Sequence, residues 1–159
     1  MHRLDWLVDH MEHSDTMALW LHRQFTYEFA QQSLADWEEE FAEGQYNNEW
    51  KCLIAIEDGQ LLGGAAFADN DLSDRPELGP WLACVFVRSE ARGRGLAAEL
   101  IESICSHAKR SGVNRLYLHT HDQQAYYAKR GWQLQERFDA WGMAQWLMFR
   151  DLQKTKHPK

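Results

Sequence analysis

The spacing of apolar residues in the N-terminal part of the chain predicts two amphipathic helices. Apolar side chains recur every four residues between positions 17 and 29, and Ser14 stands where an N-cap is expected. A second helix over 34–43 would begin at a Ser33 cap and end at Gly44, because serine favours helix starts and glycine favours helix ends. Two helices are therefore expected before the first long apolar run.

Short apolar runs predict the strands. The runs 52–56 and 61–67 are separated by Asp58-Gly59, a strong hairpin signal. The run 81–87 is almost continuously apolar, as expected of a strand buried within a sheet. The remaining expected elements are strands at 3–8, 116–120, 132–137 and 143–149, and helices at 96–110 and 123–130.

The predicted order of elements is β-α-α-β-β-β-α-β-α-β-β. Antiparallel hairpins with one helical crossover to a parallel neighbour indicate an α+β fold, with a mixed, mostly antiparallel central sheet of about seven strands and about four helices. The 159 residues suffice for one domain with its own core. We expect a single domain over 1–153, followed by a polar C-terminal tail at 154–159.

Composition narrows the function classes. No run approaches the roughly 20 apolar residues of a membrane span, and no signal peptide is recognisable, so no membrane partner is expected. The net charge of −7 and the lack of a basic stripe argue against nucleic-acid binding. Three scattered cysteines predict free thiols in a reducing, cytoplasmic compartment. No pair or helix face with metal-ligand spacing suggests a metal.

One segment, residues 85–98, carries the clearest chemical signal. It is expected to run from a strand through a tight turn into a helix, with glycines at 93 and 95. Glycines allow a ligand close to the backbone, and the free N–H groups of a helix N-terminus attract phosphate. Arg92 and Arg94 add positive charge. The segment therefore predicts a phosphate or pyrophosphate site.

Three kinds of phosphate loop compete for this segment. A Walker A loop needs Gly-Lys-Ser/Thr, which is absent. A dinucleotide fingerprint matches in letters as Gly93-x-Gly95-x-x-Ala98, but it normally follows the first strand of a parallel half. Here it lies past mid-chain behind an antiparallel hairpin. The acidic residue expected at the end of the next strand is not clear either, because Asp122 comes too late for a ribose contact.

The third kind of loop fits best. The segment resembles the CoA-binding motif of the GNAT (GCN5-related N-acetyltransferase) superfamily, Gln/Arg-x-x-Gly-x-Gly/Ala, here Arg92-x-x-Gly95-x-Ala97. A second block, residues 127–132, resembles the family's Tyr-x-x-x-Gly-Phe block with tryptophan in place of phenylalanine. The order of elements matches across the chain, although the N-terminal half matches in layout alone.

The resemblance implies an acetyl-CoA-dependent N-acetyltransferase that needs no metal. Acetyl-CoA would be a cosubstrate, and an amine would attack its thioester directly, in a cleft where the strands 81–87 and 116–120 splay apart. The cofactor-binding residues it implies are the backbone of Val85, Phe86 and Val87 for pantetheine, and Arg92, Gly93, Arg94, Gly95, Leu96, Ala97 and Ala98 for the pyrophosphate.

The resemblance also suggests catalytic residues. Tyr127 stands where the family places its general acid; the less favoured alternative is a packing residue beside Tyr126. The strand 81–87 lacks the acidic residue that many relatives use as a base. His119 falls about where other relatives place it, and an imidazole near its ordinary pKa could take an ammonium proton. Asp122 and Glu77 are lesser candidates.

The acceptor stays open between a small-molecule amine, which we favour, and a protein N-terminus or lysine. A non-catalytic module that binds acyl-CoA is a third alternative. The acidic loop 69–77 could pair with a cationic amine, although a solvated loop is the simpler interpretation. A monomer or homodimer is expected, because small dimers are common in the family.

Overall fold

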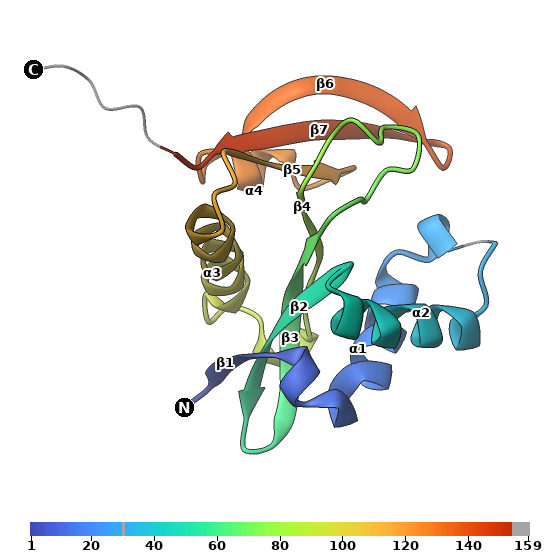
Figure 1. Cartoon of the computed structure of the whole chain (residues 1–159), viewed down its shortest axis with the longest axis vertical. Coiled ribbons are helices and arrows are strands. Elements are labelled where there is room, and N and C mark those ends of the chain that lie inside the picture. The colour runs from blue at the N-terminus through green and yellow to red at the C-terminus, as the bar shows by residue number, and fades with distance from the viewer. Residues whose placement is uncertain (30, 154–159) are drawn as a thin grey trace, which may run out of the picture.

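The computed structural model describes residues 1–29 and 31–153, which form one seven-stranded sheet in the order β1-β2-β3-β4-β5-β7-β6 (Figure 1). The strands are β1 (Arg3–Trp6), β2 (Trp50–Glu57), β3 (Gln60–Ala68), β4 (Trp81–Val87), β5 (Arg115–Thr120), β6 (Gln133–Ala140) and β7 (Met143–Asp151). The α-helices are α1 (Ser14–Gln24), α2 (Leu34–Asn47), α3 (Leu96–Arg110) and α4 (Gln124–Ala128). Every strand pair is antiparallel except β4 with β5. The predicted α+β class and element order are confirmed.

Helices cover both faces of the sheet. Figure 1 shows α3 on one face and α1 with α2 on the other. The apolar side of α3 packs into one core cluster through Leu100, Ile101 and Ile104, which are fully buried. Trp37 of α2 and Met17 of α1 belong to a second cluster, on the opposite face. The central strands β2, β3 and β4 are therefore buried between two helical layers, whereas the edge strand β6 is largely exposed.

Two local predictions are confirmed by specific contacts. The hairpin between β2 and β3 turns at Asp58-Gly59, with Glu57 paired to Gln60. The hydroxyl of Ser33 accepts a hydrogen bond from the backbone N–H of Asp36 at 3.1 Å, so Ser33 caps α2.

The first helix differs from its prediction at both ends. Ser14 is its first residue rather than its cap, and no side chain caps this end with a hydrogen bond. The helix stops at Gln24, well before Phe29. The hydroxyl of Thr26 donates to the carbonyls of residues 22 and 23 at 3.0 and 2.8 Å, which satisfies acceptors that a longer helix would have used. A separate 3₁₀ turn, Thr26–Phe29, follows.

The end of α2 was also predicted wrongly. Gly44 lies inside the helix, which continues to Asn47 and ends at Asn48, whose φ is 66°. A Cβ at position 44 would lie 2.5 Å from Cδ1 of Trp50. Glycine is therefore present so that the helix can approach the Trp50 ring closely.

The middle of the sheet opens at β4. Two residues of β4, Cys84 and Val85, stand opposite the single residue Ala65 of β3, so the strand bulges there. Within the described residues, β4 and β5 pair in register only at Trp81 and Tyr117. The two strands then separate, as the resemblance implied, and the rest of the β4 edge faces a cleft.

The remaining sequence predictions concern the C-terminus and the membrane. The predicted polar tail at 154–159 lies outside the described residues. Across residues 1–29 and 31–153, the helices are too short or too polar to cross a bilayer.

Candidate active site

A cleft of about 1050 Å³ occupies the space between β4 and β5. Its walls come mainly from the end of α1, the 3₁₀ turn 26–29, α2, the loop 70–75, β4, the start of α3, β5, α4 and the β6–β7 hairpin. Seven of the sequence-predicted site residues line it: Val85, Phe86, Val87, Arg92, Ala97, His119 and Tyr127. The fold therefore brings both predicted motifs to one cavity.

The other predicted cofactor residues are outside the lining of the cleft. In the described part of the chain the lining does not include Gly93, Arg94, Gly95, Leu96 or Ala98. The first three are exposed on the turn before α3, whereas the side chain of Leu96 is buried in the core. For Leu96 the backbone N–H, and not the side chain, is the group that a ligand could reach.

The turn before α3 has the features that a diphosphate requires. Gly93 and Gly95 have φ values of 83° and 76°, and a Cβ on either would meet nothing within 4 Å. The first helical hydrogen bond runs from Glu99 N–H to Gly95 O at 3.0 Å. The N–H groups of residues 96–98 precede that bond and lie at the positive end of the helix dipole. The residues present thus fit a phosphate-bearing cofactor.

The two arginines of this turn differ. Arg92 lines the cleft, where its Nε donates to the Val87 carbonyl at 2.9 Å and its guanidinium lies 5.7 Å from the Phe86 ring centroid. Arg94 points toward the β2–β3 hairpin and contacts Glu57 at 3.2 Å. Arg92 is therefore the better placed of the two to meet a ligand in the cleft.

Tyr127 is a buried residue of the short helix α4. Its ring lies 6.0 Å from that of Trp132 and 5.4 Å from that of Tyr126, so it also packs. Burial raises the pKa of Tyr127, and the nearby Tyr126 and Asp122 raise it further. The phenol therefore keeps its proton at neutral pH and can donate it.

His119 sits in an aromatic and acidic pocket on β5. Its Nε2 lies 2.9 Å from Oδ2 of Asp71, although the contact is an ion pair rather than an aligned hydrogen bond. Trp141 stacks on the imidazole at 5.6 Å. Leu116 and Leu118 are buried on the opposite face of the strand, because successive side chains of a strand point to opposite faces.

The pKa of His119 departs from the near-ordinary value expected from the sequence. Burial is the largest influence and lowers it, but the carboxylates of Asp71 and Glu28, with the Gln145 side chain, outweigh burial and raise the pKa to about 9. At pH 7 the imidazole is therefore mostly protonated, and it stands in the cleft as a cation.

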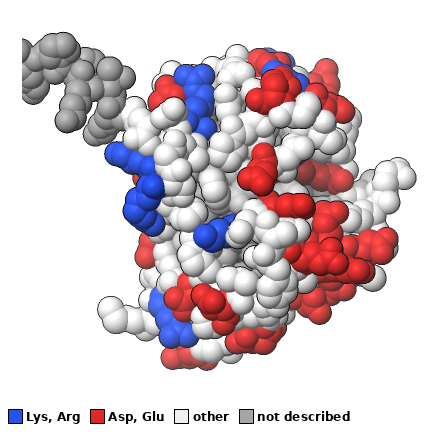
Figure 2. All heavy atoms as spheres, in the orientation of Figure 1, with Lys and Arg blue, Asp and Glu red and all other residues white. Residues whose placement is uncertain are grey.

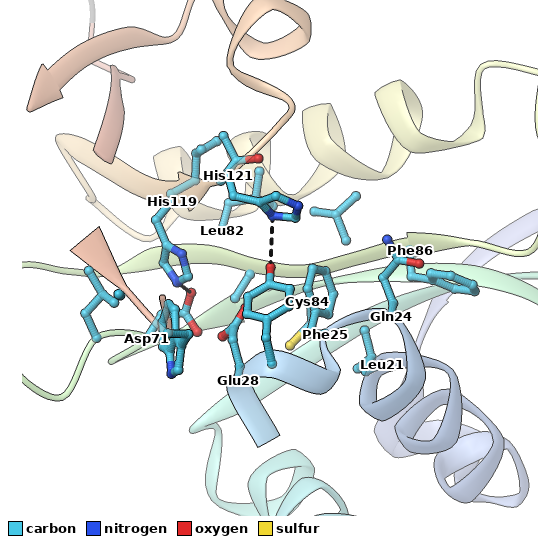
Figure 3. A pocket seen from close by; sticks show the side chains of 18 of the residues that line it. Leu21, Gln24, Phe25, Glu28, Asp71, Leu82, Cys84, Phe86, His119 and His121 are labelled. Atoms are coloured by element: carbon cyan, nitrogen blue, oxygen red, sulfur yellow. Dashed lines mark hydrogen bonds and ion pairs between the residues drawn. The ribbon is translucent and has the colours of Figure 1, made fainter. Parts of the chain in front are cut away.

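Sequence reasoning missed Tyr27 and Glu28, which the 3₁₀ turn presents to the cleft. Figure 3 labels Glu28 beside Asp71. The Tyr27 hydroxyl lies 3.2 Å from Nδ1 of His121. Burial raises the pKa of the Glu28 carboxyl to about 7, with Asp71 adding to the effect. The one available signal in the sequence is that Glu28 stands between two aromatic residues, Tyr27 and Phe29. The predicted helix through Phe29 would have given its side chain a different direction.

The two lesser candidates for the base, Asp122 and Glu77, differ in their position relative to the cleft. Asp122 lines the cleft, whereas Glu77 is exposed and pairs with Arg75 at 2.7 Å, which lowers its pKa. The interpretation of 69–77 as a merely solvated loop is wrong at Asp71, whose side chain is only 14% exposed. That loop reaches the cleft.

The lining of the cleft is acidic. Among the described residues, six carboxyl side chains line the cavity against two guanidinium groups and the His119 imidazolium, and Arg75 is already paired with two glutamates. The carboxyl groups are Glu28, Glu40, Asp71, Asp74, Asp122 and Asp139. Figure 2 shows acidic side chains gathered on the half of the surface that carries α2, with Lys and Arg mainly toward α3. The field at the mouth therefore favours a cation.

Comparison with known proteins adds sequence relatives. The family model described as Acetyltransferase (GNAT) family matches residues 14–132. N-alpha-acetyltransferase 80 of Mus musculus is 44% identical over 52 residues, which are 33% of this chain and 17% of that protein. The chain thus matches about a sixth of that relative's length.

Solved structures share the fold across nearly the whole chain. Aminoglycoside 6'-acetyltransferase type Ii superposes with a TM-score of 0.75 at 16% identity, covering 97% of this chain and 99% of that one. YncA of Salmonella typhimurium, solved with acetyl-CoA, gives 0.70 at 17% identity and covers 100% and 98%. An acetyltransferase from Staphylococcus aureus gives 0.72 at 16% identity, covering 96% and 100%. At these identities the likeness establishes the fold.

Proposed function

Because the chain belongs to the acetyltransferase (GNAT) family, we propose that it transfers the acetyl group of acetyl-CoA to a primary amine of a small cationic molecule. The observation that carries the proposal is a single cleft with two unlike halves. One half is formed by the end of β4 and leads to the turn before α3, and the other contains His119, Asp71 and Glu28. Such a cleft can hold a diphosphate-bearing thioester on one side and a cationic amine on the other.

We assign the cofactor half from the groups that the fold leaves free. The backbone of Val85, Phe86 and Val87 lies on the β4 edge that separates from β5, where an extended pantetheine arm could pair like an added strand. The N–H groups of residues 93–98 would hold the pyrophosphate, with Arg92 beside them. Arg94 would join only by leaving Glu57.

Acetyl transfer needs a neutral amine, a donor for the developing oxyanion and a proton for the departing thiolate. Tyr127 is our candidate for the last role, because its phenol lines the cleft and stays protonated. Backbone N–H groups at 85–87 are candidates for the oxyanion. We propose that His119 also helps to deprotonate the amine. A protonated imidazole next to an ammonium lowers the pKa of the ammonium, and this favours the neutral, nucleophilic amine.

The acceptor class follows from charge. The six carboxyl groups of the lining attract a cation, and a small molecule can reach the half-buried pair of Glu28 and Asp71. A protein N-terminus is the second candidate, favoured by the 52-residue likeness to an N-alpha-acetyltransferase. A protein substrate would also need the exposed rim of the cleft to bind the residues that follow its terminal amine.

A panel of acceptors tests the proposal. Purified protein is mixed with acetyl-CoA and with diamines, polyamines, an aminoglycoside, a lysine peptide or peptides with free N-termini, and thiol release is followed with mass analysis of the product. We expect acetylation of cationic small amines at the highest kcat/KM. Exclusive use of peptides would replace the acceptor class, and thiol release with no amine at all would contradict amine acetylation.

We also propose that residues 1–153 act as one N-acetyltransferase domain. All three cysteines are free thiols, with Cys52 and Cys105 buried, which supports the prediction of a reducing cytoplasmic location. Sedimentation analysis would distinguish a monomer from a homodimer.

A further inference from the structure

Glu28 enters the acceptor half from an element that the strand motifs do not involve. It lies on the 3₁₀ turn 26–29, and its backbone N–H donates to the Phe25 carbonyl at 2.8 Å. Figure 3 shows its carboxyl group next to that of Asp71, on the side of the cleft where His119 approaches from β5. Local backbone structure therefore holds this acid in the cleft.

The groups that face Glu28 come from four elements. Tyr27 belongs to its own turn, Asp71 to the loop after β3, His119 to β5 and Cys84 to β4. Burial raises the pKa of the Cys84 thiol well above its ordinary value, and burial likewise raises that of the Tyr27 phenol. Both groups are therefore neutral at pH 7. The Tyr27 hydroxyl also contacts Nδ1 of His121, at 3.2 Å.

We propose that Glu28 accepts the proton of the bound ammonium, and that His119 and Asp71 position and tune it. The assignment deepens the proposed function and rests on it. With Glu28 ionised, the trio of one imidazolium and two carboxylates carries one net negative charge, which complements one ammonium. Asp71 and Glu28 are the carboxyl groups that lie near enough to Cys84, at the β4 bulge, to raise the pKa of its thiol. Asp71 is already engaged by His119.

The proton transfers balance. The ammonium gives one proton to the Glu28 carboxylate, and its nitrogen lone pair becomes available. That lone pair forms the new C–N bond as the C–S bond breaks. Tyr127 gives its proton to the departing thiolate, and the second proton lost by the nitrogen returns to the Tyr127 phenolate. Glu28 releases its proton to water when the amide leaves.

Titration behaviour agrees with this geometry. Burial and then Asp71 raise the pKa of Glu28 to about 7, while His119 and the Tyr27 hydroxyl oppose the rise. A base is most effective when its pKa lies near the working pH. His119, whose pKa is about 9, already holds its proton at pH 7 and is poorly suited to accept another.

Two nucleophiles separate proton removal from a structural role. The first is the best primary amine of the acceptor panel, and the second is methoxyamine, whose nitrogen is already neutral at pH 7. For Glu28→Gln we expect kcat/KM with the amine to fall about 100-fold, and with methoxyamine by less than about threefold. The exposed Glu39→Gln on α2 is the matched control and should change both by less than about twofold.

The pH profile gives a second readout. The acidic limb of kcat/KM for the amine should lie near pH 7 in the wild type and disappear in Glu28→Gln. In His119→Gln it should move to higher pH, because the imidazolium lowers the pKa of Glu28. Should Glu28→Gln fold poorly, Glu28→Ala with added formate replaces it, and formate should restore the amine reaction alone.

The outcomes are distinguishable. Equal losses with both nucleophiles, or an acidic limb that survives Glu28→Gln, overturn the role of Glu28 and leave the proposed function standing. A wild-type protein that acetylates no amine overturns both.

Discussion

Replacement of His119 should remove a pH-dependent contribution to folding stability. The pKa of His119 rises from an ordinary 6.5 to about 9 in the folded protein. The folded state therefore binds the proton more tightly than the unfolded state, and the contribution is complete below pH 6.5 and lost as pH rises through about 9. At about 1.4 kcal/mol per pH unit, the pKa change corresponds to about 3 kcal/mol.

The comparison is best made in a Glu28→Gln background, because the imidazolium and Glu28 affect each other's pKa. Urea unfolding of Glu28→Gln between pH 6.5 and 9 should show most of the 3 kcal/mol decline, about 2–3 kcal/mol. The double variant Glu28→Gln/His119→Gln should be nearly flat. His2→Gln, which removes an imidazole outside the cleft, should keep the decline. Equal slopes with and without His119 would refute the ion pair with Asp71 as its cause.

Two further predictions concern catalysis and packing. Tyr127→Phe keeps the ring against Trp132 but removes the phenol hydroxyl. In thiol-release assays kcat should therefore fall at least about tenfold, whereas CoA affinity, measured by calorimetry, should stay within about twofold. Turnover within about twofold of wild type across pH 6–9 would exclude the general-acid role. Gly44→Ala should lower the free energy of unfolding in urea by about 1–3 kcal/mol, because the new Cβ would lie 2.5 Å from Cδ1 of Trp50. Helix propensity alone predicts a gain of about 1 kcal/mol, and a measured gain of that size would contradict the close approach.

The elements with a strong periodic pattern could be predicted to the residue. The predicted ranges of β4 and α3 agree with the structure at both ends, since a continuous apolar run and a regular apolar helix face leave few alternatives. The hairpin at Asp58-Gly59 was predictable because the turn chemistry is local. Gly44 was misread because the reason for glycine there is a tertiary contact with Trp50.

The site divides in the same way. The residues that the motifs name lie in contiguous blocks, and the fold brings Val85, Arg92, His119 and Tyr127 to one cleft. Glu28 was missed because α1 ends at Gln24, which re-aims the chain after it. The role of a loop carboxylate such as Asp71 depends on a partner from a distant strand, and no local pattern encodes that pairing.

Binding of free CoA tests the central claim, that the turn before α3 receives the cofactor's diphosphate. Gly95 and Gly59 offer a matched pair, because their φ values are 76° and 77° and a Cβ on either would meet nothing within 4 Å. Titration calorimetry should show CoA bound by the wild type and by Gly59→Asp with similar affinity, and at least about tenfold more weakly by Gly95→Asp, whose carboxylate would repel the phosphates. Equal affinity of the two variants for CoA would contradict the claim.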